Sequence, residues 1–121
     1  MSAYSIKALQ SVNAQFHAVL NTSSRVDYPM DSNGEFYNLL GAIPMIGQND
    51  TSSEIFYKDD VTSLTKFCND VGVKITSMWS INRDKPTAEG KIGSKNSLYL
   101  DTRLPNIKKY EFSDLLRNQR N

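Results

Sequence analysis

The chain has 121 residues, enough for one modest domain but too few for a complete eight-stranded α/β barrel, which needs roughly 250. Hydrophobic residues make up 39% and charged residues 22%, a composition typical of globular and not of disordered chains. The formal net charge is +1 and the basic side chains are scattered, so nothing in the composition favours binding to nucleic acid.

A helix is predicted over residues 4–20, because apolar side chains recur there every three or four positions and would share one face. The residues of this face are Ile6, Leu9, Val12, Phe16 and Val19. Polar residues and Pro29 then break the pattern. Ser32 and Glu35 have the spacing of a capping box, which predicts a short helical stretch over residues 35–40.

Two strands are predicted on either side of a second helix. Residues 42–47 are apolar without alternation, as expected for a strand buried on both faces of a parallel sheet, and residues 73–81 are predicted to form a second buried strand. The helix between them is predicted over residues 59–71. A strand, a helix and a second strand form a right-handed βαβ unit with parallel strands, so the predicted fold class is α/β.

The boundaries of the second helix follow from residues near its ends. Asp59 or Asp60 is expected to cap its start, and Gly72 to end it. Cys68, the only cysteine, is interpreted as a small buried apolar residue, and without a second cysteine the redox compartment is left open. The expected buried face consists of Val61, Leu64, Phe67, Cys68 and Val71.

The C-terminal part begins with a long segment, residues 85–109, that has no helical period and is expected to be a functional or poorly ordered loop. Within it, residues 97–100 are a candidate short extended segment. A last helix is predicted over residues 110–118, with Phe112 and Leu116 among its inward-facing residues.

No metal or other cofactor is expected, because the single histidine, His17, has no second His or Cys at metal-ligand spacing. No apolar run approaches the roughly 20 residues that span a bilayer, so no membrane partner is expected. Residues 1–10 lack the basic region and apolar core of a secretion signal. The chain as given is therefore expected to stay in the cytosol or to be a piece of a longer protein.

Polar side chains follow both predicted strands, at the carboxyl edge where ligands bind in parallel α/β sheets. Trp79, the only tryptophan, lies close to this edge and would offer a flat apolar surface suited to the C–H face of a sugar ring. The alternative is a core residue packed beside Met45 and Phe67, and spacing alone names no reaction. The polar candidates are Gln48, Asn49 and Asp50 after the first strand and Asn82, Arg83 and Asp84 after the second.

Several segments resemble, in order and at matching spacing, the last third of the catalytic barrel of glycoside hydrolase family 18, the chitinases. They are "IPMIGQND" (43–50), "SEIFYKDDVTSLTKFCNDVGV" (53–73), "ITSMWSINRD" (75–84) and "YEFSDLL" (110–116). Residues 2–20 are similar to the helix that follows the sixth strand of that barrel. The resemblance implies a partial (β/α)8 TIM barrel, made of about the last two βα units and the preceding helix.

By the same resemblance, Trp79 occupies the place of the tryptophan that forms the floor of the sugar subsite at the barrel mouth. Gln48 and Asn49 would stand at the same mouth, and Met45 is a further candidate contact. For Asn82, Arg83 and Asp84, a structural role in holding the last loop of the barrel is at least as well supported as a role in contacting sugar.

The family's catalytic motif, D-x-x-D-x-D-x-E, does not occur in residues 1–121. In the family its Glu protonates the glycosidic oxygen, and an Asp positions the N-acetyl group of the substrate as nucleophile in place of a protein carboxylate. The nearest acidic residues, Asp27, Asp31 and Glu35, are separated by proline and glycine and have other spacing. The Met-Asp-Tyr of the sixth strand would fall just before residue 1. The chain is therefore not expected to hydrolyse chitin alone.

Three functional interpretations remain open. The chain is the C-terminal part of a chitinase-like glycosidase acting on β-1,4-linked N-acetylglucosamine polymers, a carbohydrate-binding remnant without catalysis, or a truncated product without retained function. Chitin or an N-acetylglucosamine oligosaccharide is the expected partner, and the family usually works outside the cell. Two parallel strands leave unpaired edges, so the chain is expected to be marginally stable, to self-associate, or to need a complementary N-terminal piece of the barrel.

Overall fold

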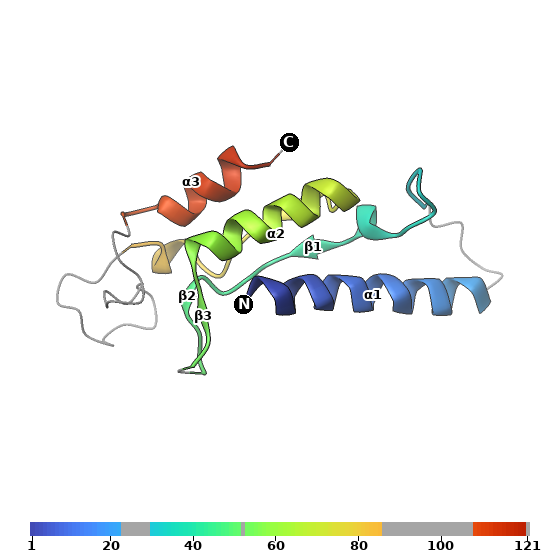
Figure 1. The fold of residues 1–121 in the computed structure, drawn as a ribbon, viewed down its shortest axis with the longest axis horizontal. Coiled ribbons are helices and arrows are strands. Elements are labelled where there is room, and N and C mark those ends of the chain that lie inside the picture. The colour runs from blue at the N-terminus through green and yellow to red at the C-terminus, as the bar shows by residue number, and fades with distance from the viewer. Residues whose placement is uncertain (23–29, 52, 86–107, 121) are drawn as a thin grey trace.

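The computed structural model describes residues 1–22, 30–51, 53–85 and 108–120, and it contains three α-helices, two 3-10 turns and four short strands within these ranges. Helix α1 packs against α2, and α2 packs against α3, as Figure 1 shows. In chain order the elements are α1 (Ser2–Thr22), the 3-10 turn η1 (Tyr37–Leu39), β1 (Gly41–Ala42), β2 (Gly47–Gln48), β3 (Ile55–Phe56), α2 (Lys58–Val71), β4 (Ile75–Thr76), the 3-10 turn η2 (Ile81–Arg83) and α3 (Glu111–Asn118).

The predicted βαβ unit is present as β1, α2 and β4. Strands β1 and β4 are parallel, with Gly41 opposite Ile75 and Ala42 opposite Thr76. The same register continues to a single bridge between Met45 and Trp79.

Both strands are shorter than predicted, and Pro44 gives a physical reason. In the observed register the residue at this position would donate its backbone N–H toward β4, and proline has none. The ladder is therefore interrupted between its first two pairs and the bridge at Met45.

The prediction that residues 42–47 are buried on both faces was wrong, and the second strand is only partly buried. Along β1 and the residues after it, Ala42, Pro44 and Ile46 are buried, whereas Ile43 is exposed. On the second strand, Ile75 and Trp79 are exposed as well. Side chains alternate between the two faces of a sheet, so the helices cover one face and leave the other open.

A β-hairpin formed by β2 and β3 follows the first strand, and the sequence pattern did not predict it. Gly47 lies opposite Phe56 and Gln48 opposite Ile55, and the two strands are antiparallel. Gly47 has a φ of 68°, a conformation that glycine adopts without steric cost. The chain can thus leave the direction of β1 and fold back through β3 into α2.

The second helix agrees with its prediction at both ends to within one residue. Gly72 follows it with a φ of 84°, the left-handed conformation of a C-terminal cap. At the start, Asp60 is the third helical residue, and its carboxylate accepts the backbone N–H of Tyr57 at 2.8 Å. The core that forms around α2 contains Leu9, Leu40, Ala42, Ile46, Ile55, Phe56, Val61, Leu64, Cys68, Val73, Phe112 and Leu116.

The predicted helix over residues 35–40 is reduced to the turn η1, and the proposed capping box does not form. The carboxylate of Asp31 accepts the backbone N–H groups of Asn33 and Glu35, both at 2.9 Å. The side chain of Glu35 instead binds α1, so it cannot cap a helix of its own.

The first and last helices also match their predictions, with partial exceptions in burial. Helix α1 extends the predicted residues 4–20 slightly at both ends, but Val12 and Val19 of its predicted inward face are exposed. Helix α3 buries Phe112 and Leu116. Residues 86–107, most of the predicted loop, lie outside the described residues. None of the helices in the described ranges combines enough length with enough apolar character to cross a bilayer.

Candidate functional site

The uncovered face of the parallel strand pair carries the main candidate residue, Trp79. Residues paired in a parallel sheet point to the same side, so Ile43, Met45, Ile75 and Trp79 share this face. Ile43 is 66% exposed, Ile75 63% and Trp79 60%. We call these four residues the open sheet face. The sequence analysis did not identify Ile43 and Ile75 as members of the open sheet face. The reason is that an apolar segment has the same sequence pattern whether or not a further layer of the protein covers it.

The position of Trp79 is fixed by its backbone. Its N–H donates to the carbonyl of Pro44 at 2.8 Å, and its carbonyl accepts the N–H of Ile46 at 3.0 Å. The peptide bond between Trp79 and Ser80 is cis. The indole is therefore held beside Met45, and it does not fill a core formed by the described residues of this chain. A half-exposed indole can stack on the apolar face of a sugar.

Gln48 and Asn49 belong to the hairpin and use their side-chain donors within it. The amide of Gln48 donates to the carbonyls of Thr51 and Glu54 at 3.2 and 3.4 Å, and the amide of Asn49 donates to the Glu54 carboxylate at 3.4 Å. The side-chain oxygen of Asn49 is buried and accepts no hydrogen bond from the described residues. The structure thus brings Met45 next to Trp79, while Gln48 and Asn49 remain predictions as sugar contacts.

Arg83 connects the turn η2 to the end of the first strand. Its Nε donates to the carbonyl of Ile46 at 3.3 Å, and its guanidinium also donates to the carbonyl of Gln48. Burial lowers the pKa of Arg83, and the negative charge of Asp50 acts in the opposite direction. A buried guanidinium that donates hydrogen bonds to two backbone carbonyls stabilises the fold. This agrees with the structural role that was the alternative for Arg83.

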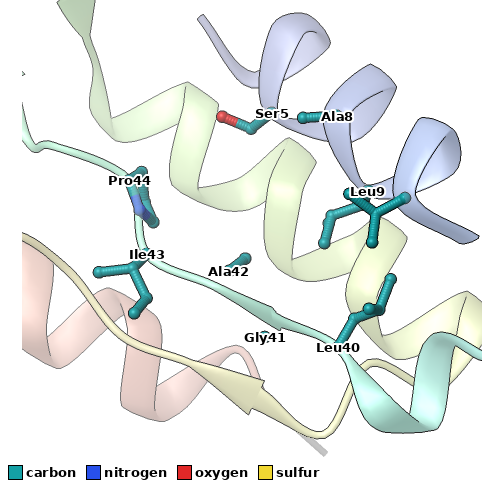
Figure 2. A pocket seen from close by; sticks show the side chains of 9 residues that line it. Ser5, Ala8, Leu9, Leu40, Gly41, Ala42, Ile43 and Pro44 are labelled. Carbon is teal, nitrogen blue, oxygen red and sulfur yellow. The ribbon is translucent and has the colours of Figure 1, made fainter.

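Cavities among the described residues include one between α1 and β1 (Figure 2), one beside β4 and α3, and one that is lined in part by Tyr4 and Tyr57. Trp79 does not line any of these three. No group of three or more His, Cys, Asp or Glu side chains that could hold a metal ion occurs in the part of the chain that the structure describes.

Relatives were found among curated proteins, although no protein-family model matches the chain. Over 71 residues it is 31% identical to Endochitinase 11 of Metarhizium anisopliae, covering 59% of this chain and 14% of that protein. It is also 31% identical over 71 residues to a probable bifunctional chitinase/lysozyme of Escherichia coli, covering 57% and 8%. The aligned region thus spans no more than 14% of the length of either relative.

Solved structures show the same relationship at the level of the fold. The catalytic domain of a hyperthermophilic chitinase from Pyrococcus furiosus matches 98% of this chain with a TM-score of 0.73 at 21% identity, and the match covers 34% of that domain. A structure of catalytic-site mutants of a thermostable chitinase from the same organism, complexed with chito-oligosaccharides, matches equally well. The chain therefore resembles chitinases in sequence, as predicted, and its mixed helix-and-strand fold matches about one third of a chitinase catalytic domain.

Proposed function

We propose that the chain is the C-terminal part of a family-18 chitinase-like glycosidase that acts on chitin, and that its fold is a partial (β/α)8 barrel. The parallel pair β1 and β4, joined by α2, is the repeating unit of such a barrel. The open sheet face then corresponds to the inside of the barrel, where the side chains of further strands would cover Ile43 and Ile75.

The observation that carries this proposal is the exposed indole of Trp79 beside Met45 at the end of a parallel strand. Ligands of parallel α/β folds bind at the carboxyl ends of the strands. An aromatic ring there, in a chain similar to chitinases, supports stacking on an N-acetylglucosamine unit of chitin or of a chitin oligosaccharide.

Hydrolysis is assigned to the whole barrel and not to this chain alone, because residues 1–121 contain no D-x-x-D-x-D-x-E motif. The longer protein would act outside the cell, as its family resemblance suggests. We expect the chain alone to release no product from chitin oligosaccharides. Finding the motif encoded in frame upstream of Met1 would support the glycosidase, and its absence would favour the second candidate.

The second candidate is a carbohydrate-binding remnant without catalysis. It is supported by the combination of an exposed Trp79 and the absence of the catalytic motif from this sequence. Both candidate functions require that the chain binds sugar, so a binding measurement tests the site at Trp79 that they share. Hydrolysis of chitin by a longer protein would distinguish the glycosidase from the binding remnant.

Sugar binding can be measured by titrating chitin oligosaccharides while following fluorescence, because Trp79 is the only tryptophan. We expect the emission to change on binding, and we expect Trp79→Ala to weaken binding by about 1–3 kcal/mol in calorimetry, by analogy with bases stacked on aromatic side chains. Tyr4→Ala removes another exposed aromatic, on α1, and is expected to bind as the unmodified chain does. Unchanged fluorescence at millimolar sugar, or unchanged affinity of Trp79→Ala, contradicts the stacking role.

A further inference from the structure

The turn over residues 31–34 contains the only asparagine of the sequence that is followed by glycine, Asn33. Asn33 and Gly34 are both exposed, and Figure 1 shows this part of the chain at the end of the molecule that also holds the C-terminal end of α1. Gly34 has a φ of 74°, and a Cβ atom added to it would lie more than 4 Å from the described residues beyond its two chain neighbours. Water and base can therefore reach the peptide bond between Asn33 and Gly34.

The side-chain amide of Asn33 makes no hydrogen bond to the described residues, although its backbone N–H donates to the Asp31 carboxylate at 2.9 Å. The side-chain amides of Asn13, Asn49 and Asn69, in contrast, each donate a hydrogen bond within the fold. The residues that follow these three asparagines are Ala, Asp and Asp, whose Cβ atoms crowd the backbone nitrogen, whereas glycine has no Cβ. Asn33 thus combines an unbonded amide with an unhindered neighbour.

We propose that Asn33 is a site of spontaneous deamidation, where the amide is converted into aspartate or isoaspartate. The backbone nitrogen of Gly34 loses its proton to base and attacks the side-chain amide carbon of Asn33. The bond from this carbon to the amide nitrogen breaks, ammonia leaves, and a cyclic imide remains. Water then opens the imide at one of its two carbonyl carbons, which gives aspartate or isoaspartate. The net reaction consumes one water molecule and releases one ammonia molecule.

One hydrogen bond within the turn opposes this attack, since the N–H of Gly34 donates to the carbonyl of Asp31 at 3.0 Å. Hydrogen bonds in exposed turns open at little free-energy cost, whereas those of core helices and strands open only at a cost close to that of global unfolding. The reaction at Asn33 therefore proceeds in the folded chain, and unfolding in urea is expected to accelerate it further.

The isoaspartate product disturbs the way in which this turn is attached to α1. Its main chain passes through the side chain of residue 33 and is longer by one carbon atom. Two hydrogen bonds enclose this residue, because Glu35 donates its N–H to the Asp31 carboxylate at 2.9 Å and Asp31 donates its N–H to the Glu35 carbonyl at 2.8 Å. The longer chain cannot keep both bonds aligned. Since the Glu35 carboxylate accepts the side-chain amide of Asn13 at 2.6 Å, the attachment to α1 weakens as well.

The experiment keeps the full chain in mildly alkaline buffer and follows each asparagine by mass spectrometry with peptide fragmentation. Two asparagines serve as references, namely Asn69, which is held in α2, and Asn118, which is exposed but followed by Gln119. We expect Asn33 to gain the mass that turns an amide into an acid at least about tenfold faster than either reference, because its turn opens readily and its neighbour is glycine. Methylation by an isoaspartate methyltransferase detects the isoaspartate fraction. If Asn33 reacts no faster than Asn118, the proposal is wrong.

One pair of variants tests the chemistry. Asn33→Gln keeps an amide but moves it one carbon atom further from the nitrogen of Gly34, so we expect conversion at this position to be lost. Asn118→Gln makes the same change at an exposed position on α3 and should leave the reaction at Asn33 unchanged. Ammonia release that is equal in the two variants would overturn the proposal.

Hydrogen exchange tests the consequence for the fold. The backbone N–H of Phe36 donates to the side-chain oxygen of Asn13 at 2.8 Å, so it reports the attachment to α1. In the isoaspartate form we expect this amide to exchange at least about tenfold faster, whereas the amide of Ile46, bonded to Trp79, keeps its rate. Unchanged exchange at Phe36 would contradict the weakened attachment. No readout involves sugar, so a failure of the proposed function is seen separately.

Discussion

At the scale of single residues, Asp84 shows how the polar group after the second strand serves the fold. Its side chain is fully buried, and its carboxylate accepts the backbone N–H of Phe112 at 3.0 Å and that of Ser113 at 2.8 Å. The hydroxyl of Ser113 donates to the same carboxylate at 2.5 Å. Asp84 thus supplies acceptors to the first turn of α3, whose free N–H groups have no partner inside the helix. The structural role that was predicted for Asp84 as an alternative to sugar binding explains these hydrogen bonds without a ligand.

Asp84→Asn tests this anchoring. The substitution keeps the size of the side chain but turns an N–H donor or a weaker acceptor toward the donors of α3, so we expect the free energy of unfolding to fall by about 1–3 kcal/mol. Urea denaturation followed by circular dichroism measures it. Asp114→Asn, at an exposed position on the same helix, is the control and should change stability little. Equal stability of the two variants would contradict the anchoring role.

At the scale of elements, a polar cluster attaches residues 31–36 to α1. The amide of Asn13 donates to the Glu35 carboxylate at 2.6 Å, and its side-chain oxygen accepts the backbone N–H of Phe36 at 2.8 Å. His17 Nε2 lies 2.7 Å from the same carboxylate, and the ring of His17 packs edge-on against Phe36. Hydrogen bonds from Asn13 and from His17 lower the pKa of Glu35 below its ordinary value of 4.5. The cluster fixes the chain before β1 and so fixes the direction in which β1 starts.

The pKa of Glu35 predicts how this attachment depends on pH. A carboxyl group with a lowered pKa in the folded state contributes stability above pH 4.5, and the contribution is lost as pH falls through the folded-state pKa. We therefore expect Glu35→Gln to have a lower free energy of unfolding than the unmodified chain at pH 7. Below the folded-state pKa of Glu35, the two free energies of unfolding should differ less. Urea denaturation at a series of pH values, with Asp70→Asn as the exposed control, measures the difference. A difference that is constant with pH would contradict the role of the carboxylate.

At the scale of the whole molecule, the open sheet face is the feature with the largest consequence. Ile43, Ile75 and Trp79 are each at least 60% exposed, and together they leave apolar side chains of neighbouring strands in water. A chain that cannot bury such a face alone is expected to be marginally stable or to associate. This expectation agrees with the finding that the chain matches only about one third of a chitinase catalytic domain.

Replacing Ile43 and Ile75 by Thr tests the role of this face. We expect the double variant to associate at least about tenfold more weakly than the unmodified chain, because each buried Ile contributes about 1.5–3 kcal/mol. Sedimentation velocity over a range of concentrations measures the change. Leu39→Thr, an exposed apolar position outside the face, is the control. A sharp unfolding transition of the unmodified chain as a dilute monomer would contradict the expectation.

Local sequence signals predicted most of the regular structure. The apolar spacing of Val61, Leu64 and Cys68 and the stop at Gly72 define α2 to within one residue, because helix periodicity and caps depend on neighbours in the chain. The hairpin that starts at Gly47 was missed, since its strands pair over only two residues each and carry no alternating pattern. For the candidate site, the sequence predicted only that Met45 and Trp79 lie close together, because the two residues belong to adjacent parallel strands.

The sequence by itself determined the three helices, the order of strand, helix and strand, and the resemblance to chitinases, because these depend on residues that are close together along the chain or on motifs in a fixed order. Only the tertiary structure decided that Trp79 and Ile43 are exposed and that Glu35 binds α1. The physical reason is that exposure and hydrogen-bond partners depend on which elements lie next to a residue in space. An apolar strand has the same sequence whether its neighbours are present or absent.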